Sequence, residues 1–165
     1  MKQQATLSIR EANPDDVLLI ASLIRELAVY EKLADVCQVT ESVLSGHLFG
    51  PNPRAEVMVV EWANQPVGFA LYFFTFSTFA CAPSLYLEDV FIRPAYRRRG
   101  AGQAVMHALA RRAVEAGCAR FEWAVLDWNR PAIDFYRKFG ADVMDDWRLC
   151  RLSGNALESL ARSEP

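Results

Sequence analysis

The chain has 165 residues, of which 52% are apolar and 23% charged, with a net charge of −2. Its length suits one domain, and its apolar content supplies a core, which excludes disorder for most of the chain. The charge excludes a domain-wide basic footprint for nucleic acid, and the N-terminal residues lack the apolar segment of a secretory signal. We expect one cytoplasmic domain over residues 1–165, with neither nucleic acid nor membrane as a partner.

The cysteines argue against a disulfide framework or a metal site. Cys37, Cys81, Cys118 and Cys150 are far apart, no C-x-x-C pair occurs, and the chain has only two histidines. Such cysteines are typical of small buried side chains in a reducing compartment. We therefore expect buried thiols and no bound metal.

Residues 62–87 contain no charged side chain, which is long enough to raise the question of a membrane span. Pro66 and Pro83 interrupt this run near both ends, and several polar residues lie between them. A spanning helix must satisfy its backbone groups internally, which these residues make difficult. The aromatic-rich stretch 67–76 indicates a buried strand instead.

Helix and strand signals alternate along the chain. Asn13 is the expected N-cap of the first helix, with Pro14 at its first position, and Thr40 caps the second. The expected order is strand 6–10, helix 14–32, a helix from 41 to the 50–53 turn, strands 57–62, 67–76 and 85–92, helix 100–116, strand 120–126, helix 130–139, strand 147–152 and a short C-terminal helix. This order predicts one mixed α/β domain.

The turn after the third of these central strands has the residues of an anion-binding site. It contains Arg93 and the run Arg97-Arg-Arg-Gly100-Ala-Gly102, which leads into a helix. Glycines allow close approach of the backbone, the first helical N–H groups point at an anion, and arginines add charged hydrogen bonds. The spacing fits neither a G-x-x-x-x-G-K-[ST] loop nor a G-x-G-x-x-G dinucleotide motif. The alternative is a solvated basic turn before a helix.

Glu88 and Asp89 interrupt an otherwise apolar strand. Adjacent strand residues point to opposite faces, so one carboxylate is expected to face a polar group inside the fold. The alternative is an edge strand with two solvated acids.

The pattern Arg97-x-x-Gly100-x-Gly102 resembles the pyrophosphate-binding turn of the GCN5-related N-acetyltransferases (GNAT). The chain is most similar to the diamine and polyamine branch, which includes the spermidine/spermine and thialysine acetyltransferases. The resemblance covers nearly the whole chain, in the stretches 24–31, 86–89, 96–102, 125–129, 135–136 and 140–141.

This resemblance implies a GNAT fold, which is a single α/β domain with a mixed, mostly antiparallel sheet flanked by helices. It also implies a homodimer and acetyl-CoA as the co-substrate, whose thioester a primary amine attacks directly. Tyr136 would protonate the departing CoA sulfur, whereas its periodicity alone favours a core tyrosine. Glu88 would hold the amine or the water that deprotonates it.

The remaining site residues follow from the same resemblance. The backbone of the strand end would pair with the pantetheine arm, the turn would bind the pyrophosphate, and Asn129, which is also a helix N-cap candidate, would bind the cofactor arm. The implied cofactor-binding residues are Val90, Phe91, Ile92, Arg97, Arg98, Arg99, Gly100, Ala101, Gly102, Gln103 and Asn129. The implied substrate-binding residues are Tyr30, Glu31, Glu88 and Asp89.

The loop Ser77-Thr78-Phe79 departs from the polyamine-specific pattern, which has an acid and a tryptophan there. This favours a shorter acceptor, such as a diamine, thialysine or a lysine-like amine. Two alternatives are the same chemistry on a peptide, protein or drug amine, and a CoA-binding module without catalysis. The presence of both Tyr136 and Glu88 argues against the second, since a binder needs neither.

Overall fold

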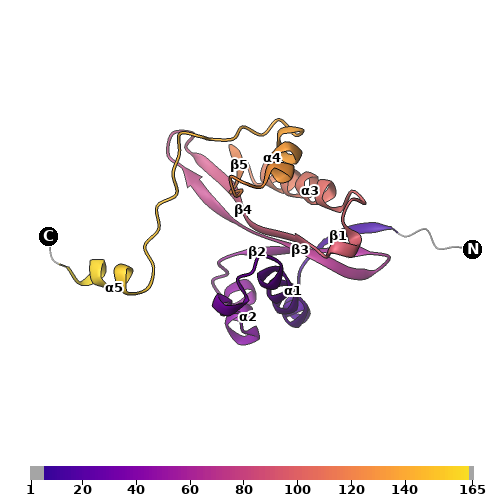
Figure 1. Ribbon diagram of the computed structural model, residues 1–165, viewed down its shortest axis with the longest axis horizontal. Helices are drawn as coiled ribbons and strands as arrows, with labels where there is room; N and C mark the ends of the chain where they lie inside the picture. Colours follow the sequence, from indigo (N-terminus) through magenta and orange to yellow (C-terminus); the bar gives the residue numbers. More distant parts are fainter. Residues whose placement is uncertain (1–5, 164–165) are drawn as a thin grey trace, which may run out of the picture. The chain divides into compact units, whose positions relative to one another are not determined.

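A computed structural model describes residues 6–163, which form two compact units divided between Ala124 and Val125. The first unit contains a five-stranded sheet whose order follows the chain. Helices α1 and α2 lie on one face of this sheet and α3 on the other (Figure 1). The strands are β1 (Leu7–Glu11), β2 (Glu56–Trp62), β3 (Gln65–Ser77), β4 (Ala82–Ile92) and β5 (Arg120–Trp123).

The α1 face holds the main apolar core of the first unit. Its helices are α1 (Val17–Tyr30) and α2 (Glu41–Phe49), preceded by the 3₁₀ turns η1 (Pro14–Asp16) and η2 (Ala34–Val36). Both sides of the central strands are covered, because four consecutive residues are buried in each of β2 and β3. The core cluster consists of Ile20, Leu23, Leu27, Leu48, Val57, Phe69 and Phe91.

The opposite face is tied to α3 (Ala101–Glu115) by a polar network. The hydroxyl of the fully buried Tyr72 donates to Glu56 at 2.8 Å, and Arg112 of α3 pairs with the same carboxylate at 3.0 Å. Burial raises the pKa of Tyr72 to about 12, so its hydroxyl remains a donor. The network therefore fixes the helix that follows the arginine turn.

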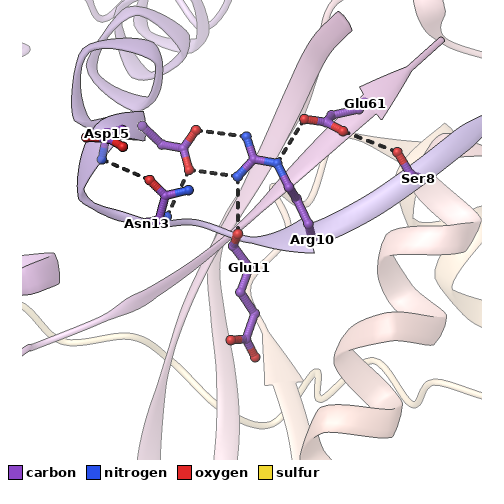
Figure 2. A network of polar contacts seen from close by, with 7 residues as sticks. Ser8, Arg10, Glu11, Asn13, Asp15 and Glu61 are labelled. Carbon is purple, nitrogen blue, oxygen red and sulfur yellow. Dashed lines mark hydrogen bonds and ion pairs between the residues drawn. The ribbon is translucent and has the colours of Figure 1, made fainter. Parts of the chain in front are cut away.

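The start of α1 is anchored to the sheet by Arg10. Its guanidinium donates to both oxygens of Asp16, at 2.7 and 2.8 Å, and to Glu61 of β2 at 2.9 Å (Figure 2). Asn13 caps η1 as the sequence predicts, with Asp16 accepting the backbone N–H of Asn13. The Arg10 guanidinium holds the pKa of the Asp16 carboxyl below its usual value.

The charge-free run forms strands, as expected. Residues 62–87 cover the end of β2, all of β3 and the first half of β4, and the turn at Ala63 and Asn64 joins the first two through two residues of positive φ. Their burial is less complete than expected, because Phe76 and Phe79 are exposed. Within residues 6–163, no helix combines the length and the apolar character that crossing a membrane requires.

The second unit contains α4 (Arg130–Arg137) and α5 (Gly154–Arg162). The predicted strand 147–152 is wrong: the segment is irregular, and Trp147 and Leu149 are exposed. A run of apolar residues forms a strand only where a neighbouring backbone pairs with it, and the described residues of this unit contain no strand. The predicted C-terminal helix is confirmed as α5.

Other differences are smaller. The strand predicted over 120–126 ends at Trp123, because its partner β4 pairs with it only as far as Leu87. All four cysteines are free, as expected, but none is fully buried, since Cys81 and Cys150 lie in exposed connections. The α/β class and the mostly antiparallel sheet are confirmed.

Candidate active site

Strand β4 and its neighbour β5, at the edge of the sheet, separate after Leu87. Strand β5 runs parallel to β4 and pairs with it only from Ser84 to Leu87, whereas β3 pairs with β4 as far as Ile92. Beyond Leu87, one backbone edge of β4 therefore lies past the end of β5. Unpaired strand edges bind extended ligands by backbone hydrogen bonds, which suits Val90, Phe91 and Ile92 to a pantetheine arm.

At the same point, β4 has a β-bulge in its pairing with β3. Leu87 is opposite Tyr72 and Asp89 is opposite Leu71, so Glu88 has no partner residue on β3. Bulges of this kind redirect side chains and are common next to active sites. The bulge interrupts the alternation on which the sequence expectation rests, and it leaves Glu88 exposed while Asp89 is half-buried.

Three carboxylates lie close enough to influence one another. Burial, followed by the negative charges of Glu88 and Glu31, raises the pKa of Asp89 to about 6. Glu31 is the C-cap of α1, so the helix end and the β4 bulge contribute to one acidic cluster. A cationic amine fits such a cluster, because it offsets the mutual repulsion of the carboxylates.

The arginine turn, which connects β4 to α3 through the 3₁₀ turn η3 (Pro94–Tyr96), has the backbone expected of an anion site. Gly100, the N-cap of α3, has a φ of 83°, a conformation that favours glycine. Ala104 donates to the Gly100 carbonyl at 2.9 Å, so the preceding N–H groups of Ala101, Gly102 and Gln103 have no carbonyl one turn back within the helix. These groups and the helix dipole can bind a phosphate.

The arginines of the turn have different surroundings. The Arg97 Nε donates to the Ile92 carbonyl at 2.8 Å, and its Cζ lies 4.2 Å from the centroid of the Tyr30 ring. Arg99 lies over the ring of Trp62, at 5.3 Å. Arg98 is exposed, with a φ of 60°. Arg98 and Arg99 are thus the arginines of the turn that face solvent.

Arg93, at the start of the same turn, is bound to the protein. Its guanidinium donates to both oxygens of Glu26, at 2.7 and 2.8 Å, and to the Pro66 carbonyl at 2.9 Å. Arg93 holds the pKa of Glu26 below its usual value. This arginine therefore holds the turn against α1. Contrary to what the sequence suggested, it does not add to the anion-binding site.

The second unit contains the other two predicted site residues. Asn129 is the N-cap of α4, which confirms its interpretation as a helix N-cap. Its side chain accepts the Ala132 N–H at 3.3 Å. Burial raises the pKa of Tyr136, which keeps its hydroxyl protonated at neutral pH. Within residues 6–163, no group of three or more histidine, cysteine or acidic side chains is placed to hold a metal ion.

Three features of the site have no signal in the sequence. The stacking of Arg97 on Tyr30 joins residues 67 positions apart, and the Glu26–Arg93 pair joins residues equally far apart. The bulge at Glu88 also depends on the pairing of two strands and not on a local motif. The functional roles given to the site residues stay predictions.

Comparisons with known proteins show the family to which the chain belongs. The chain is 38% identical to thialysine N-epsilon-acetyltransferase of Sus scrofa, over 95% of this chain and 98% of that one, and 34% identical to L-ornithine N5-acetyltransferase NATA1 of Arabidopsis thaliana, over 92% and 86%. An integron cassette protein from the mobile metagenome of V. cholerae has a similar structure, with a TM-score of 0.81 at 26% identity over 95% of this chain and 98% of that one. Residues 26–141 match the model of the Acetyltransferase (GNAT) family. The chain therefore belongs to the GNAT acetyltransferases, a family of acyltransferases, and has their α/β fold.

Proposed function

We propose that this enzyme transfers the acetyl group of acetyl-CoA to the primary amine of a small aliphatic amine, such as a diamine, thialysine or a lysine-like amine. The observation that carries this proposal is the acidic cluster of Glu31, Glu88 and Asp89 at the open edge of β4. A cluster of three carboxylates favours a cationic acceptor. The names of the relatives, which refer to thialysine and ornithine, support the same class of substrate.

The reaction needs a base because an alkylammonium has a pKa of about 10.4 and cannot attack while it is protonated. Glu88 is exposed at the bulge, so a water molecule can carry the proton from the amine to its carboxylate. The free amine then attacks the thioester carbonyl, the C–S bond breaks, and the nitrogen loses its second proton to water as the amide forms. A backbone N–H of β4 polarises the carbonyl, and Tyr136 donates its proton to the leaving thiolate.

We assign the binding of acetyl-CoA mainly to residues whose backbone groups are free to form hydrogen bonds with it. The open edge of β4 at Val90, Phe91 and Ile92 binds the pantetheine arm, and the turn from Arg97 to Gln103 binds the pyrophosphate. Asn129 contributes a hydrogen bond to the arm. Acetyl-CoA supplies the activated acetyl group, and no metal takes part.

The proposal also covers the domain organisation, the oligomeric state and the location of the protein. Residues 1–165 act as a single N-acetyltransferase domain, which forms a homodimer in the cytoplasm. The single domain rests on the chain length and the family resemblance, the homodimer on the resemblance alone, and the cytoplasmic location on the cysteine pattern.

The acceptor is tested with purified protein, acetyl-CoA and a panel of amines, with release of the CoA thiol as the readout. The panel contains thialysine, ornithine, lysine, putrescine, spermidine and a lysine-containing peptide. We expect the shorter amines to have higher kcat/KM values than spermidine, because the 77–79 loop lacks an acid. Activity only with the peptide would favour the peptide alternative, and tight acetyl-CoA binding without turnover of any amine would favour the binding module.

A further inference from the structure

Arg97 begins the turn that the proposed function assigns to the pyrophosphate, yet its side chain is directed toward other parts of the protein. Its Nε is bonded to the carbonyl of Ile92, the last residue of β4, at 2.8 Å. Its Cζ lies 4.2 Å above the ring centroid of Tyr30, the last residue of α1. Arginine stacks well on aromatic rings because its guanidinium is planar and weakly hydrated. The side chain is thus held from two directions.

Tyr30 is itself supported by the core. Its ring contacts the ring of Phe91, with 6.3 Å between centroids, and Phe91 belongs to the cluster packed under α1. The Arg97 Cζ also lies 5.8 Å from the Phe91 ring. The three side chains form a stack that joins the end of α1, the end of β4 and the first residue of the turn.

Arg98 differs in each of these respects. It is exposed, its backbone is in the left-handed region, and within residues 6–163 its side chain forms no hydrogen bond or ion pair. A charged group in this position can turn toward a phosphate without losing a protein contact. The neighbouring arginines therefore divide into one that is held and one that is available.

We infer that Tyr30 and Arg97 are a positioning pair: the Tyr30 ring fixes the Arg97 side chain, and Arg97 fixes the turn whose N–H groups, together with Arg98, receive the phosphates of the co-substrate. This inference rests on the proposed function, since it places acetyl-CoA at the turn. It gives Tyr30 a role on the cofactor side of the site, in addition to the substrate contact that the resemblance implies.

The inference also connects the turn that receives the co-substrate with the acidic cluster that receives the amine. Tyr30 is followed by Glu31, whose charge acts on Asp89 in the acidic cluster. The same helix end thus borders the turn and the amine site. A change at Tyr30 alters the binding of the co-substrate without removing any group that touches it.

The test is the dissociation constant of acetyl-CoA, measured by isothermal titration calorimetry. Tyr30→Leu removes the aromatic face, and Arg97→Lys keeps the charge but removes the planar guanidinium. We expect each to weaken binding about three- to tenfold, within the range of a cation–π contact. Tyr30→Phe keeps the ring and should bind like the wild type. The double variant should be no weaker than the weaker single variant, because both substitutions remove the same contact.

Two controls separate positioning from charge and from general damage. Val29→Ala truncates the neighbouring exposed residue of α1 and should leave binding unchanged. Arg98→Gln should weaken binding at low salt and much less at high salt, because an exposed charge is screened. The loss in Tyr30→Leu should persist at high salt. Thermal unfolding of each variant checks that the fold is intact.

Several results would overturn the inference. One is wild-type affinity in Tyr30→Leu, and another is additive losses in the double variant. A third is a loss in Arg97→Lys that disappears at high salt, which would make Arg97 a direct charge contact. A wild-type protein that does not bind acetyl-CoA would instead contradict the proposed function on which the inference depends.

Discussion

At the scale of single residues, Asp89 links the acidity of the site to substrate binding. Its pKa is raised to about 6, first by burial and then by Glu88 and Glu31, so it is neutral in mild acid and charged at neutral pH. We expect the KM of the amine to fall as the pH rises through about 6. Asp89→Asn should abolish this inflection and raise the KM about tenfold or more, as loss of a charged hydrogen bond does. Steady-state kinetics between pH 5 and 8 provide the measurement.

The same residue has the opposite effect on stability. A carboxyl whose folded pKa lies above its ordinary value of 3.8 binds more protons in the folded state, so its contribution to stability falls as the pH rises from about 4 to about 6. Asp89→Asn should therefore unfold at a higher temperature than the wild type at pH 7.5. Asp15→Asn is the matched control, because Asp15 is an exposed acid in η1 and should show neither effect. An unchanged inflection in Asp89→Asn would remove Asp89 from the amine site.

Tyr136 offers a second test at the residue scale. Its raised pKa keeps the hydroxyl protonated, as an acid for the leaving thiolate requires. Tyr136→Phe should lower kcat about a hundredfold, the usual contribution of a general acid, while the dissociation constant of acetyl-CoA stays the same. Stopped-flow kinetics and calorimetry measure the two quantities. Wild-type kcat in this variant would show that the proton comes from another group.

At the scale of elements, β4 depends on a close approach by β3 at Gly68. A Cβ at Gly68 would meet the carbonyl oxygen of Phe91 and would lie 2.7 Å from Cδ1 of Ile92. We expect Gly68→Ala to destabilise the protein by about 1–3 kcal/mol, since overpacking forces the backbone to shift. It should also weaken acetyl-CoA binding, because Phe91 and Ile92 belong to the proposed pantetheine edge. Chemical denaturation and calorimetry measure these changes.

Gly46→Ala is the control for this substitution. Gly46 lies within α2, and a Cβ there has no neighbour within 4 Å. Alanine favours the helix over glycine by about 1 kcal/mol, so this variant should be slightly more stable than the wild type. Equal stability of Gly68→Ala and the wild type would mean that β3 and β4 can move apart without cost.

At the scale of the whole molecule, the sequence predicts most elements because their signals are local. Asn13 and Thr40 cap helices where expected, and Gly100 is the N-cap of α3. The failures involve distant partners: the 147–152 segment is rich in apolar residues like a strand, but the described residues of its own unit contain no strand with which it could pair. The candidate site divides in the same way. The turn is visible as a motif, whereas the Tyr30–Arg97 stack and the Glu88 bulge depend on how separate segments pack.

The open edge of β4 also affects the behaviour of the protein in concentrated solution. A strand with unpaired backbone groups is a template on which another copy can add a strand, and natural proteins protect such edges with charge. Glu88 and Asp89 lie where the open edge of β4 begins and repel the same residues of a second copy. We therefore expect their negative charges to oppose edge-to-edge aggregation while the co-substrate is absent, and on the proposed function bound acetyl-CoA would cover the same edge.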